Sequence, residues 1–296
     1  MIHAIINPIS GAGADPGAAA RRAHTIEAAA VRRRARVAIH FTERQGHARE
    51  LAAAALRDAA SGVIVWGGDG TFNETASALV GSGIPIGLVP AGSGNGLAGA
   101  LGVPREPARA VDTAFDGRPW TIDAGRIAGR YFFNIAGIGF DARVAALFNQ
   151  RAAGSRGGWP YIVIGVREGC RYCASEYRIT LEGQTRSHRA LLIAFANGRE
   201  YGLGARIAPG ARLDDGLLDV LIAEDRGVIA RFWNARHLAR GTPHLARMVM
   251  TTRTTHAVVE ADGDMEFHVD GEPGTASQRI DVEVLPGALA IRIPGP

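Results

Sequence analysis

The first third of the chain alternates short apolar runs with longer segments that have the spacing of amphipathic helices. The pattern predicts strands over 2–8, 36–42, 62–68 and 84–90, and helices over about 16–34, 46–59, 71–81 and 94–102. Strands that alternate with helices in this way pack as a parallel sheet with helices on its faces. We therefore expect a doubly wound α/β domain.

From about residue 120 the pattern changes to alternating, β-rich segments that are separated by Gly, Asp and Pro turns. They include TIDAGRIAG, RYFFNIAGIG, YRITLEG, RALLIAFANG, LLDVLIAE, MEFHVDGE and RIDVEVLPGALAIRIP. Helical stretches over 143–150 and 227–241 interrupt them. Turn-linked strands of this kind pair mainly antiparallel, so the chain divides into an α/β domain over 1–122 and a second, β-rich domain over 123–287.

Composition and charge narrow the classes of function. The 296-residue chain is 47% hydrophobic and has a formal net charge of +4, with basic residues that are scattered along the sequence. This balance does not indicate a nucleic-acid partner, although a mildly basic face suits anionic lipid. No run reaches the roughly 18 apolar residues of a membrane span and no targeting segment is recognisable, so we expect a cytoplasmic protein.

Two residue types exclude or weaken particular chemistries. Lysine does not occur, so all 33 Lys+Arg positions are arginine, which excludes a Walker A phosphate loop and a lysine Schiff base. Cys170 and Cys173 form a lone C-x-x-C without a second pair, which does not favour a metal or redox site.

Three glycine-rich loops follow strands at the same predicted edge of the sheet. They read NPISGAG (7–13), GGDGT (67–71) and PAGSGNG (90–96), and Thr42 ends the remaining strand at that edge. A glycine loop before a helix exposes backbone N–H groups and the positive end of the helix dipole, and both favour phosphate. A single loop of this kind is more often a tight turn, but three together favour a polyphosphate site.

Other phosphate-binding motifs do not fit. The segment 94–99 satisfies G-x-G-x-x-G, but it lies late in the domain and not in the first strand-to-helix turn of a dinucleotide fold. The protein-kinase set is also missing, because the chain has no H-R-D or D-F-G segment and no lysine.

At these loops the sequence resembles the diacylglycerol kinase catalytic family, the lipid kinases that include sphingosine and ceramide kinases. The resemblance spans nearly the whole chain, and its ordered set of segments is highly specific. The matching segments are NPISGAG (7–13), FTERQGHARELA (41–52), GGDGTFNE (67–74), IPIGLVPAGSGNGLA (84–98), IDAGRIAGRYFFNIAGIGFDARV (122–144), APGARLDDGLLDV (208–220) and HVDGEP (268–273).

The resemblance implies an N-terminal nucleotide-binding α/β domain, completed by a C-terminal strand over 288–296, and an antiparallel β-sandwich. The active site would lie in the cleft between them. ATP would lie against the glycine loops, and Asp69 would engage its magnesium. The residues implied around ATP are Asn7, Ser10, Gly11, Thr42, Gly67, Gly68, Asp69, Gly70, Thr71, Asn73, Glu74, Ser93, Gly94 and Asn95.

In the second domain the resemblance makes Asp270 the general base for the lipid hydroxyl, with Glu272 beside it. By itself, Asp270-Gly271 is a common hairpin turn without catalytic content. His268 would face the same side of the strand, and we assign it no role.

The same matching implies a structural magnesium site. Asp215 would give a carboxylate, and Arg212 and Leu217 would give backbone carbonyls. Asp123 would connect to this site through bound water.

Two positions depart from the family. Ser93 and Gly96 stand where the family has threonine and aspartate, so one expected carboxylate is missing. The sequence of the PAGSGNGLA loop is more similar to sphingosine kinases, whereas the GGDGT loop is more similar to diacylglycerol and ceramide kinases. The two loops therefore do not decide which lipid is the acceptor.

An apolar cluster of Trp159, Tyr161, Ile162, Phe232 and Trp233 lies among arginines in the sequence. Core packing is the favoured interpretation, and docking at a membrane is the alternative.

Together these features predict an ATP- and Mg²⁺-dependent lipid kinase that acts on diacylglycerol or a related lipid at the inner face of a membrane, as a peripheral protein and possible homodimer. An NAD kinase-like enzyme is one alternative, and the Asn73-Glu74 pair argues against it. A non-catalytic ATP- or lipid-binding regulator is another, to which Gly96 gives weight.

Overall fold

The computed structural model describes residues 1–11, 17–149, 158–201, 206–242, 245–246 and 249–295. The chain forms two compact units. The N-terminal unit comprises Met1–Ile122 with Gly287–Pro296, and the C-terminal unit comprises Asp123–Pro286. Strands β5 (Arg118–Ile127) and β15 (Arg279–Ile293) run from one unit into the other.

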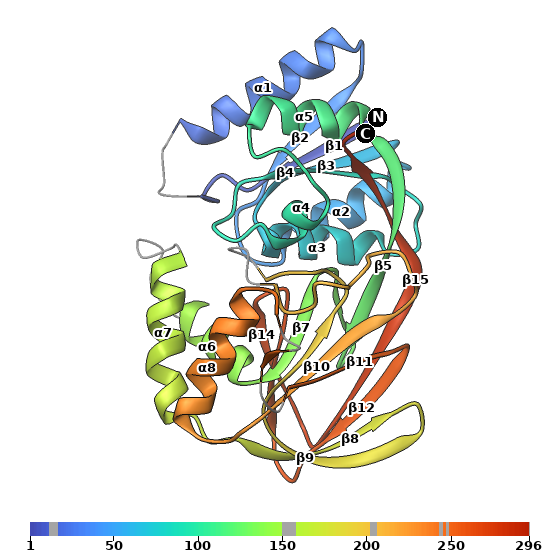
Figure 1. Ribbon diagram of the computed structural model, residues 1–296. Helices are drawn as coiled ribbons and strands as arrows, with labels where there is room; N and C mark the ends of the chain where they lie inside the picture. Colours follow the sequence, from blue (N-terminus) through green and yellow to red (C-terminus); the bar gives the residue numbers. More distant parts are fainter. Residues whose placement is uncertain (12–16, 150–157, 202–205, 243–244, 247–248, 296) are drawn as a thin grey trace. The chain divides into compact units, whose positions relative to one another are not determined.

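The N-terminal unit is built on a parallel sheet, as the alternating pattern predicts (Figure 1). Its strands are β1 (Ile2–Ile6), β2 (Val37–Phe41), β3 (Gly62–Gly67) and β4 (Ile86–Pro90), in the order β4-β3-β1-β2. The end of β15 adds a parallel strand beside β4, where Ile291 lies opposite Ile86. Strand β3 is buried along its whole length, which explains its continuous apolar run.

Helices cover both faces of this sheet (Figure 1). Their bounds are α1 (Ala18–Arg32), α2 (His47–Arg57), α3 (Asp69–Leu79), α4 (Gly96–Ala100) and α5 (Pro107–Asp116). Helices α1 and α5 pack together on one face, and α2 and α3 pack together on the other.

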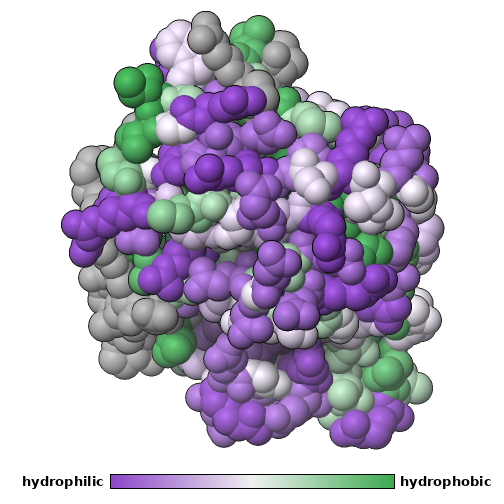
Figure 2. Space-filling model, turned by 90° about the horizontal axis from the view of Figure 1, so that it is seen from below, coloured by the Kyte–Doolittle hydropathy of each residue, from purple (hydrophilic) through white to green (hydrophobic). Residues whose placement is uncertain are grey.

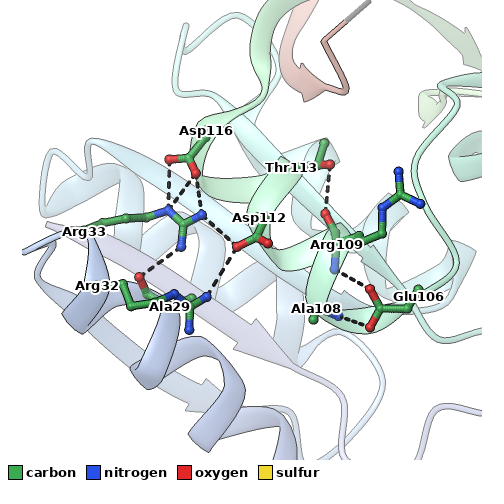
Figure 3. Close-up of polar contacts among 9 residues, drawn as sticks. All are labelled: Ala29, Arg32, Arg33, Glu106, Ala108, Arg109, Asp112, Thr113 and Asp116. Carbon is green, nitrogen blue, oxygen red and sulfur yellow. Dashed lines mark hydrogen bonds and ion pairs between the residues drawn. The ribbon is translucent and has the colours of Figure 1, made fainter.

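Helix α5 was not among the predicted elements, because two prolines near its start suggest a loop. Pro107 instead occupies the first turn, where no intrahelical N–H bond is lost. The Glu106 carboxylate caps this helix by accepting hydrogen bonds from the N–H groups of Ala108 and Arg109, at 2.9 and 2.8 Å (Figure 3).

An arginine fork joins the end of α1 to α5 (Figure 3). Arg33 donates from Nε to both oxygens of Asp116, at 2.9 and 2.8 Å, and from Nη2 to Asp112 Oδ1 at 2.7 Å. These hydrogen bonds raise the pKa of Arg33 and lower the pKa of Asp116.

The C-terminal unit is mainly antiparallel (Figure 1). Its further strands are β6 (Arg130–Phe132), β7 (Ile135–Gly139), β8 (Ser175–Leu181), β9 (Gln184–Ala196), β10 (Leu218–Glu224), β11 (Val249–Thr254), β12 (His256–Glu260), β13 (Met265–Val269) and β14 (Glu272–Ala276). They run in the order β14-β13-β7-β9-β8-β12-β15, and β10 and β11 branch from β9. Buried side chains from most of these strands, including Phe132, Phe195 and Phe267, share one core.

Three helices accompany these strands: α6 (Phe140–Asn149), α7 (Gly158–Arg171) and α8 (Val228–Ala239). Helix α7 was not predicted, because GWPYIVIGVREGCR combines glycine, proline and a β-branched run that favours a strand. Pro160 is tolerated because it lies in the first turn.

Hydrophilic residues cover most of the molecular face in Figure 2, and hydrophobic residues form only small, separate patches there. Within the described residues, no helix is both long and apolar enough to cross a bilayer.

Candidate active site

The three glycine loops of the N-terminal unit lie together at one edge of the parallel sheet. Asn7, after β1, donates from Nδ2 to Thr71 Oγ1 at 2.9 Å. Ala91, after β4, donates its N–H to the carbonyl of Gly67 at 2.8 Å. Because the strands are parallel and adjacent, their carboxyl ends meet at this edge. The convergence expected from the sequence is therefore present for the described part of each loop, and Ala12 and Gly13 lie outside the described residues.

Two of the loops touch through glycines. A Cβ added at Gly92 would lie 2.7 Å from Gly68 Cα and 2.9 Å from Asn95 Oδ1. A Cβ added at Gly67 would lie 2.6 Å from Thr71 Cβ. Real Cβ atoms do not come this close, so the loops can pack in this way only without side chains. The second and third loops therefore approach each other through their backbones at the start of α3.

Asn95 fixes the third loop. Its side chain accepts from the Gly92 N–H at 2.8 Å and donates to the Gly92 carbonyl at 2.6 Å. Asn95 has a positive φ of 52° and is the N-cap of α4, and Gly96 directly after it is buried. Ser93 is exposed at the tip of the loop, with Gly94 half-buried beside it.

Sequence reasoning missed Arg22, which holds the first loop. Its guanidinium donates to Ser10 Oγ at 2.9 Å, to the Ser10 carbonyl at 2.7 Å and to the Asn7 carbonyl. It also lies over the Trp66 ring, 5.8 Å from the ring centroid. Burial and the neighbouring Arg21 lower the pKa of Arg22. The sequence offers no signal that separates Arg22 from Arg21, because only the turn of α1 decides which one faces the loop.

Helix α3 begins directly at the second loop. Asp69 and Gly70 lie in its first turn, and Asn73 one turn later is buried. Glu74 accepts hydrogen bonds from the N–H groups of Gly46 and Ala48, at 2.8 and 3.2 Å, and so fixes the start of α2. Glu74, one of the residues implied around ATP, thus uses its carboxylate to cap a neighbouring helix.

The remaining strand of this edge contributes Thr42. Its N–H donates to the carbonyl of Ile6 at 2.9 Å, which continues the pairing of β2 with β1 to the edge where the loops lie.

Gly11 has a φ of +103°, and a Cβ there would lie 3.2 Å from the Ala91 carbonyl oxygen.

In the C-terminal unit, Asp270 lies in the turn between β13 and β14, and its carboxylate is bound by backbone N–H groups. Oδ2 accepts from Phe133 at 2.9 Å, and Oδ1 accepts from Asn134 and Ile135 at 2.9 and 3.1 Å. Its own N–H donates to the Ile135 carbonyl at 2.9 Å. The hairpin interpretation of Asp270-Gly271 therefore describes the backbone correctly. In addition, the connection between β6 and β7 holds the Asp270 carboxylate in one orientation.

A buried polar network lies behind this turn, and sequence reasoning missed it. His268 Nε2 is 3.2 Å from Asp141 Oδ2, and Tyr201 Oη donates to the same oxygen at 2.7 Å. The Gly271 N–H donates to His268 Nδ1 at 3.3 Å. The two-residue spacing of His268 and Asp270 was visible in the sequence, but nothing there indicated Asp141 as a partner. Glu272 is half-buried at the start of β14, opposite Val269.

The residues implied at the magnesium site lie in one loop beside Asp123. Asp123 is buried, its N–H donates to the Leu213 carbonyl at 2.7 Å, and its Oδ2 accepts from the Gly216 N–H at 2.7 Å. Asp215 Oδ1 accepts from the Leu217 N–H at 3.2 Å, and the Arg212 side chain turns toward Asp214. A carboxylate and backbone carbonyls are oxygen donors of the kind that Mg²⁺ takes, so the donor chemistry of this loop is compatible with the ion.

Among the described residues, no group of three or more His, Cys, Asp or Glu side chains could hold a metal ion. A magnesium ion at the Asp215 loop would therefore depend largely on backbone carbonyls and water. Cys170 and Cys173 are free and exposed.

Two family models match the chain. The diacylglycerol kinase catalytic domain matches residues 1–127. The YegS C-terminal NAD kinase beta sandwich-like domain matches residues 134–293. These matches confirm the predicted plan of an α/β domain followed by a β-sandwich.

Relatives cover most of the chain. The protein named diacylglycerol kinase from Mycobacterium tuberculosis (strain ATCC 25618 / H37Rv) is 32% identical over an alignment of 308 positions, which covers 99% of this chain and 95% of that protein. A "Probable lipid kinase YegS-like" from Klebsiella pneumoniae (strain 342) is 30% identical over 259 residues and 86% of each chain. The crystal structure of a diacylglycerol kinase from Bacillus anthracis str. Sterne has the same fold, with a TM-score of 0.72, 20% identity and coverage of 99% of this chain and 96% of that chain.

Proposed function

Because this chain belongs to the diacylglycerol kinase family of lipid kinases, which are phosphotransferases with an alcohol acceptor, we propose that it transfers the γ-phosphoryl group of ATP to a hydroxyl of diacylglycerol or a related lipid.

The convergence of the glycine loops is the observation that carries this proposal. Gly68 and Gly92 pack against each other at the start of α3, where backbone N–H groups and the helix dipole favour phosphate oxygens. No lysine is needed in such a cradle, since the backbone supplies the donors. Arg22 keeps the first loop in shape by binding Ser10 and the Asn7 carbonyl.

In the proposed reaction the lipid hydroxyl oxygen attacks the γ-phosphorus. The bond from that phosphorus to the β,γ-bridging oxygen breaks, and ADP leaves with the electron pair. Asp270 takes the proton of the hydroxyl. The three N–H groups that hold its carboxylate support this role, because they fix the direction in which the oxygens point.

Two parts of the chain would hold magnesium in this proposal. Asp69, in the first turn of α3, would hold the ion that accompanies ATP, and the Asp215 loop beside Asp123 would hold the structural ion. When it is bound with ATP, a magnesium ion neutralises negative charge on the phosphate groups. The protein's own contribution is to place the carboxylates and the loop backbone.

The test is transfer of labelled γ-phosphate from ATP with magnesium to a panel of diacylglycerol, sphingosine, ceramide, phosphatidylglycerol and NAD. Labelling of one lipid, lost in Asp270→Asn while ATP binding persists, is the expected result. Labelling of NAD alone would mean that the acceptor is a dinucleotide and not a lipid. ATP binding without any labelled product would favour the regulator, to which the missing carboxylate at Gly96 gives weight.

A further inference from the structure

Helix α8 carries exposed apolar side chains on one face. Ile229 is 89% exposed and Trp233 is 44% exposed. The favoured sequence interpretation placed Trp233 in a core, and the structure places it at the surface. The side chains of Trp159, Tyr161, Ile162 and Phe232 lie outside the described residues. Large apolar side chains that protrude singly are common, but two that are adjacent on a helix form a small patch.

Two arginines continue this face. Arg236 is exposed and its guanidinium lies 4.0 Å from the centroid of the Trp233 ring, and Arg240 is exposed directly after the helix. Positions 229, 233, 236 and 240 are spaced by four, three and four residues, so they line up along one side of the helix. We call Ile229, Trp233, Arg236 and Arg240 the α8 stripe.

The opposite face of α8 fixes the helix to the C-terminal unit. Arg231 pairs with Asp225 through two hydrogen bonds of 2.9 and 2.8 Å. It also donates to the carbonyls of Gly169 and Tyr172 at the end of α7, at 2.9 and 2.8 Å. Asn234 is buried on this inner side. The contacts that attach the helix are therefore made by residues outside the α8 stripe.

We propose that the α8 stripe is the surface with which this protein docks on a bilayer of anionic lipids. Ile229 and Trp233 enter the headgroup region, and the arginines meet lipid phosphates. Further exposed arginines are Arg226, just before α8, and Arg167 and Arg171 on α7, the helix that contacts α8. This inference deepens the proposed function and rests on it, because it names the surface that brings a lipid kinase to its substrate.

The charge of the α8 stripe favours a membrane over a second copy of the chain. Helix α8 contains no acidic residue. A two-fold dimer through this face would set the same arginines against each other, and like charges across an interface oppose association. An anionic bilayer supplies phosphates for the arginines and an apolar layer for Ile229 and Trp233.

The experiment is vesicle flotation with the full chain and no ATP, using phosphatidylcholine vesicles with and without phosphatidylglycerol. Wild type should bind only the anionic vesicles, and less at high salt. Ile229→Asp, and the double variant Arg236→Ala with Arg240→Ala, should each weaken binding about tenfold or more. Trp233→Phe should keep most of the binding, because an apolar aromatic ring is still present at this position.

Matched controls separate this face from general surface effects. Val31 on α1 is 76% exposed, so Val31→Asp makes the same kind of change in the other unit. Arg178→Ala removes one exposed arginine from β8. Both should bind vesicles like wild type, and the thermal unfolding of every variant should match wild type, as expected for surface changes.

Three results would overturn the proposal: no vesicle binding by wild type, wild-type binding by the stripe variants, or a wild-type dimer in light scattering that Ile229→Asp dissociates. The proposed function fails separately. If vesicle binding depends on the stripe but no lipid accepts label from ATP, then docking stands and the kinase assignment does not. If short-chain lipid in detergent is labelled equally by wild type and Ile229→Asp, then catalysis is intact and the variant tests docking alone.

Discussion

His268 Nε2 lies 3.2 Å from Asp141 Oδ2, and both side chains are buried. The Gly271 N–H approaches the other ring nitrogen, Nδ1, at 3.3 Å. Since an N–H must meet an unprotonated nitrogen, the ring proton belongs on Nε2, where it is donated to Asp141. The histidine thus connects α6 to the turn that carries Asp270.

Two substitutions of His268 separate its two hydrogen bonds. Asparagine can place its oxygen near the former Nδ1 and still accept from Gly271, whereas glutamine reaches the former Nε2 position and loses that acceptor. If His268 positions the Asp270 turn, we expect His268→Gln to lower kcat for lipid phosphorylation about tenfold, with a smaller effect for His268→Asn, because small displacements of a catalytic group are costly. The KM for ATP should not change.

Amide hydrogen exchange at Gly271 provides the matching structural measurement. Exchange should accelerate in His268→Gln more than in His268→Asn. Equal kcat values for the two variants would argue against a positioning role.

Asp270→Asn should abolish most activity and also weaken the fold locally. An amide has only one acceptor oxygen, so its NH₂ group would meet at least one of the N–H groups of Phe133, Asn134 and Ile135. We expect a loss of about 10²-fold or more in kcat from the missing base and a destabilisation of about 1–3 kcal/mol from the unmatched donors.

Calorimetry and ATP titration distinguish these two effects. A lower unfolding temperature with unchanged ATP affinity and lost transfer fits both roles of Asp270. Transfer at the wild-type rate would contradict the assignment of the base. Asp264→Asn, which removes an exposed carboxylate directly before β13 and leaves the three backbone contacts of Asp270 in place, serves as the control.

Gly92→Ala should disable the nucleotide site. Its methyl group would lie 2.7 Å from Gly68 Cα, so one of the two loops must move. We expect the dissociation constant for ATP to rise about tenfold or more, measured by calorimetric titration. Gly263→Ala is the matched control, because a Cβ there would have no heavy atom within 4 Å. Tight ATP binding by Gly92→Ala would show that phosphate binding does not depend on the contact between Gly92 and Gly68.

The sequence predicted the convergence of the glycine loops for a reason that is independent of any side chain. Parallel neighbouring strands bring their carboxyl ends to one edge, so the positions of Gly67 and Gly92 followed from the order of elements alone. The strands of the C-terminal unit were likewise predicted from alternation and turn residues.

What the sequence could not provide depends on contacts between distant segments. Arg22 and Arg21 are equivalent in the pattern until the turn of α1 is known. Asp141 and His268 are separated by 127 residues and meet only because β7 pairs with β13. Helix α7 reads as a strand locally, and tertiary packing overrides that preference.

The pair of Asp225 and Arg231 predicts how stability depends on pH. Hydrogen bonds from Arg231 hold the pKa of Asp225 below its ordinary value of 3.8, and Asp225 raises the pKa of Arg231. A carboxyl group whose pKa is lower in the folded state stabilises the protein above the unfolded pKa, and this contribution is lost as the pH falls through the folded pKa. Asp225→Asn should therefore cost about 2 kcal/mol at pH 7, and the difference from wild type should shrink as the pH falls below about 3.8.

Thermal unfolding between pH 7 and pH 2.5 measures this difference. Asp264→Asn removes a carboxylate from an exposed turn, and its effect should stay within about 0.5 kcal/mol. A gap between Asp225→Asn and wild type that persisted unchanged at pH 2.5 would mean that the ionised pair is not what holds α8. Because Arg231 also binds the Gly169 and Tyr172 carbonyls, Arg231→Gln should destabilise the protein even at low pH, where Asp225 is protonated and the contacts to α7 remain to be lost.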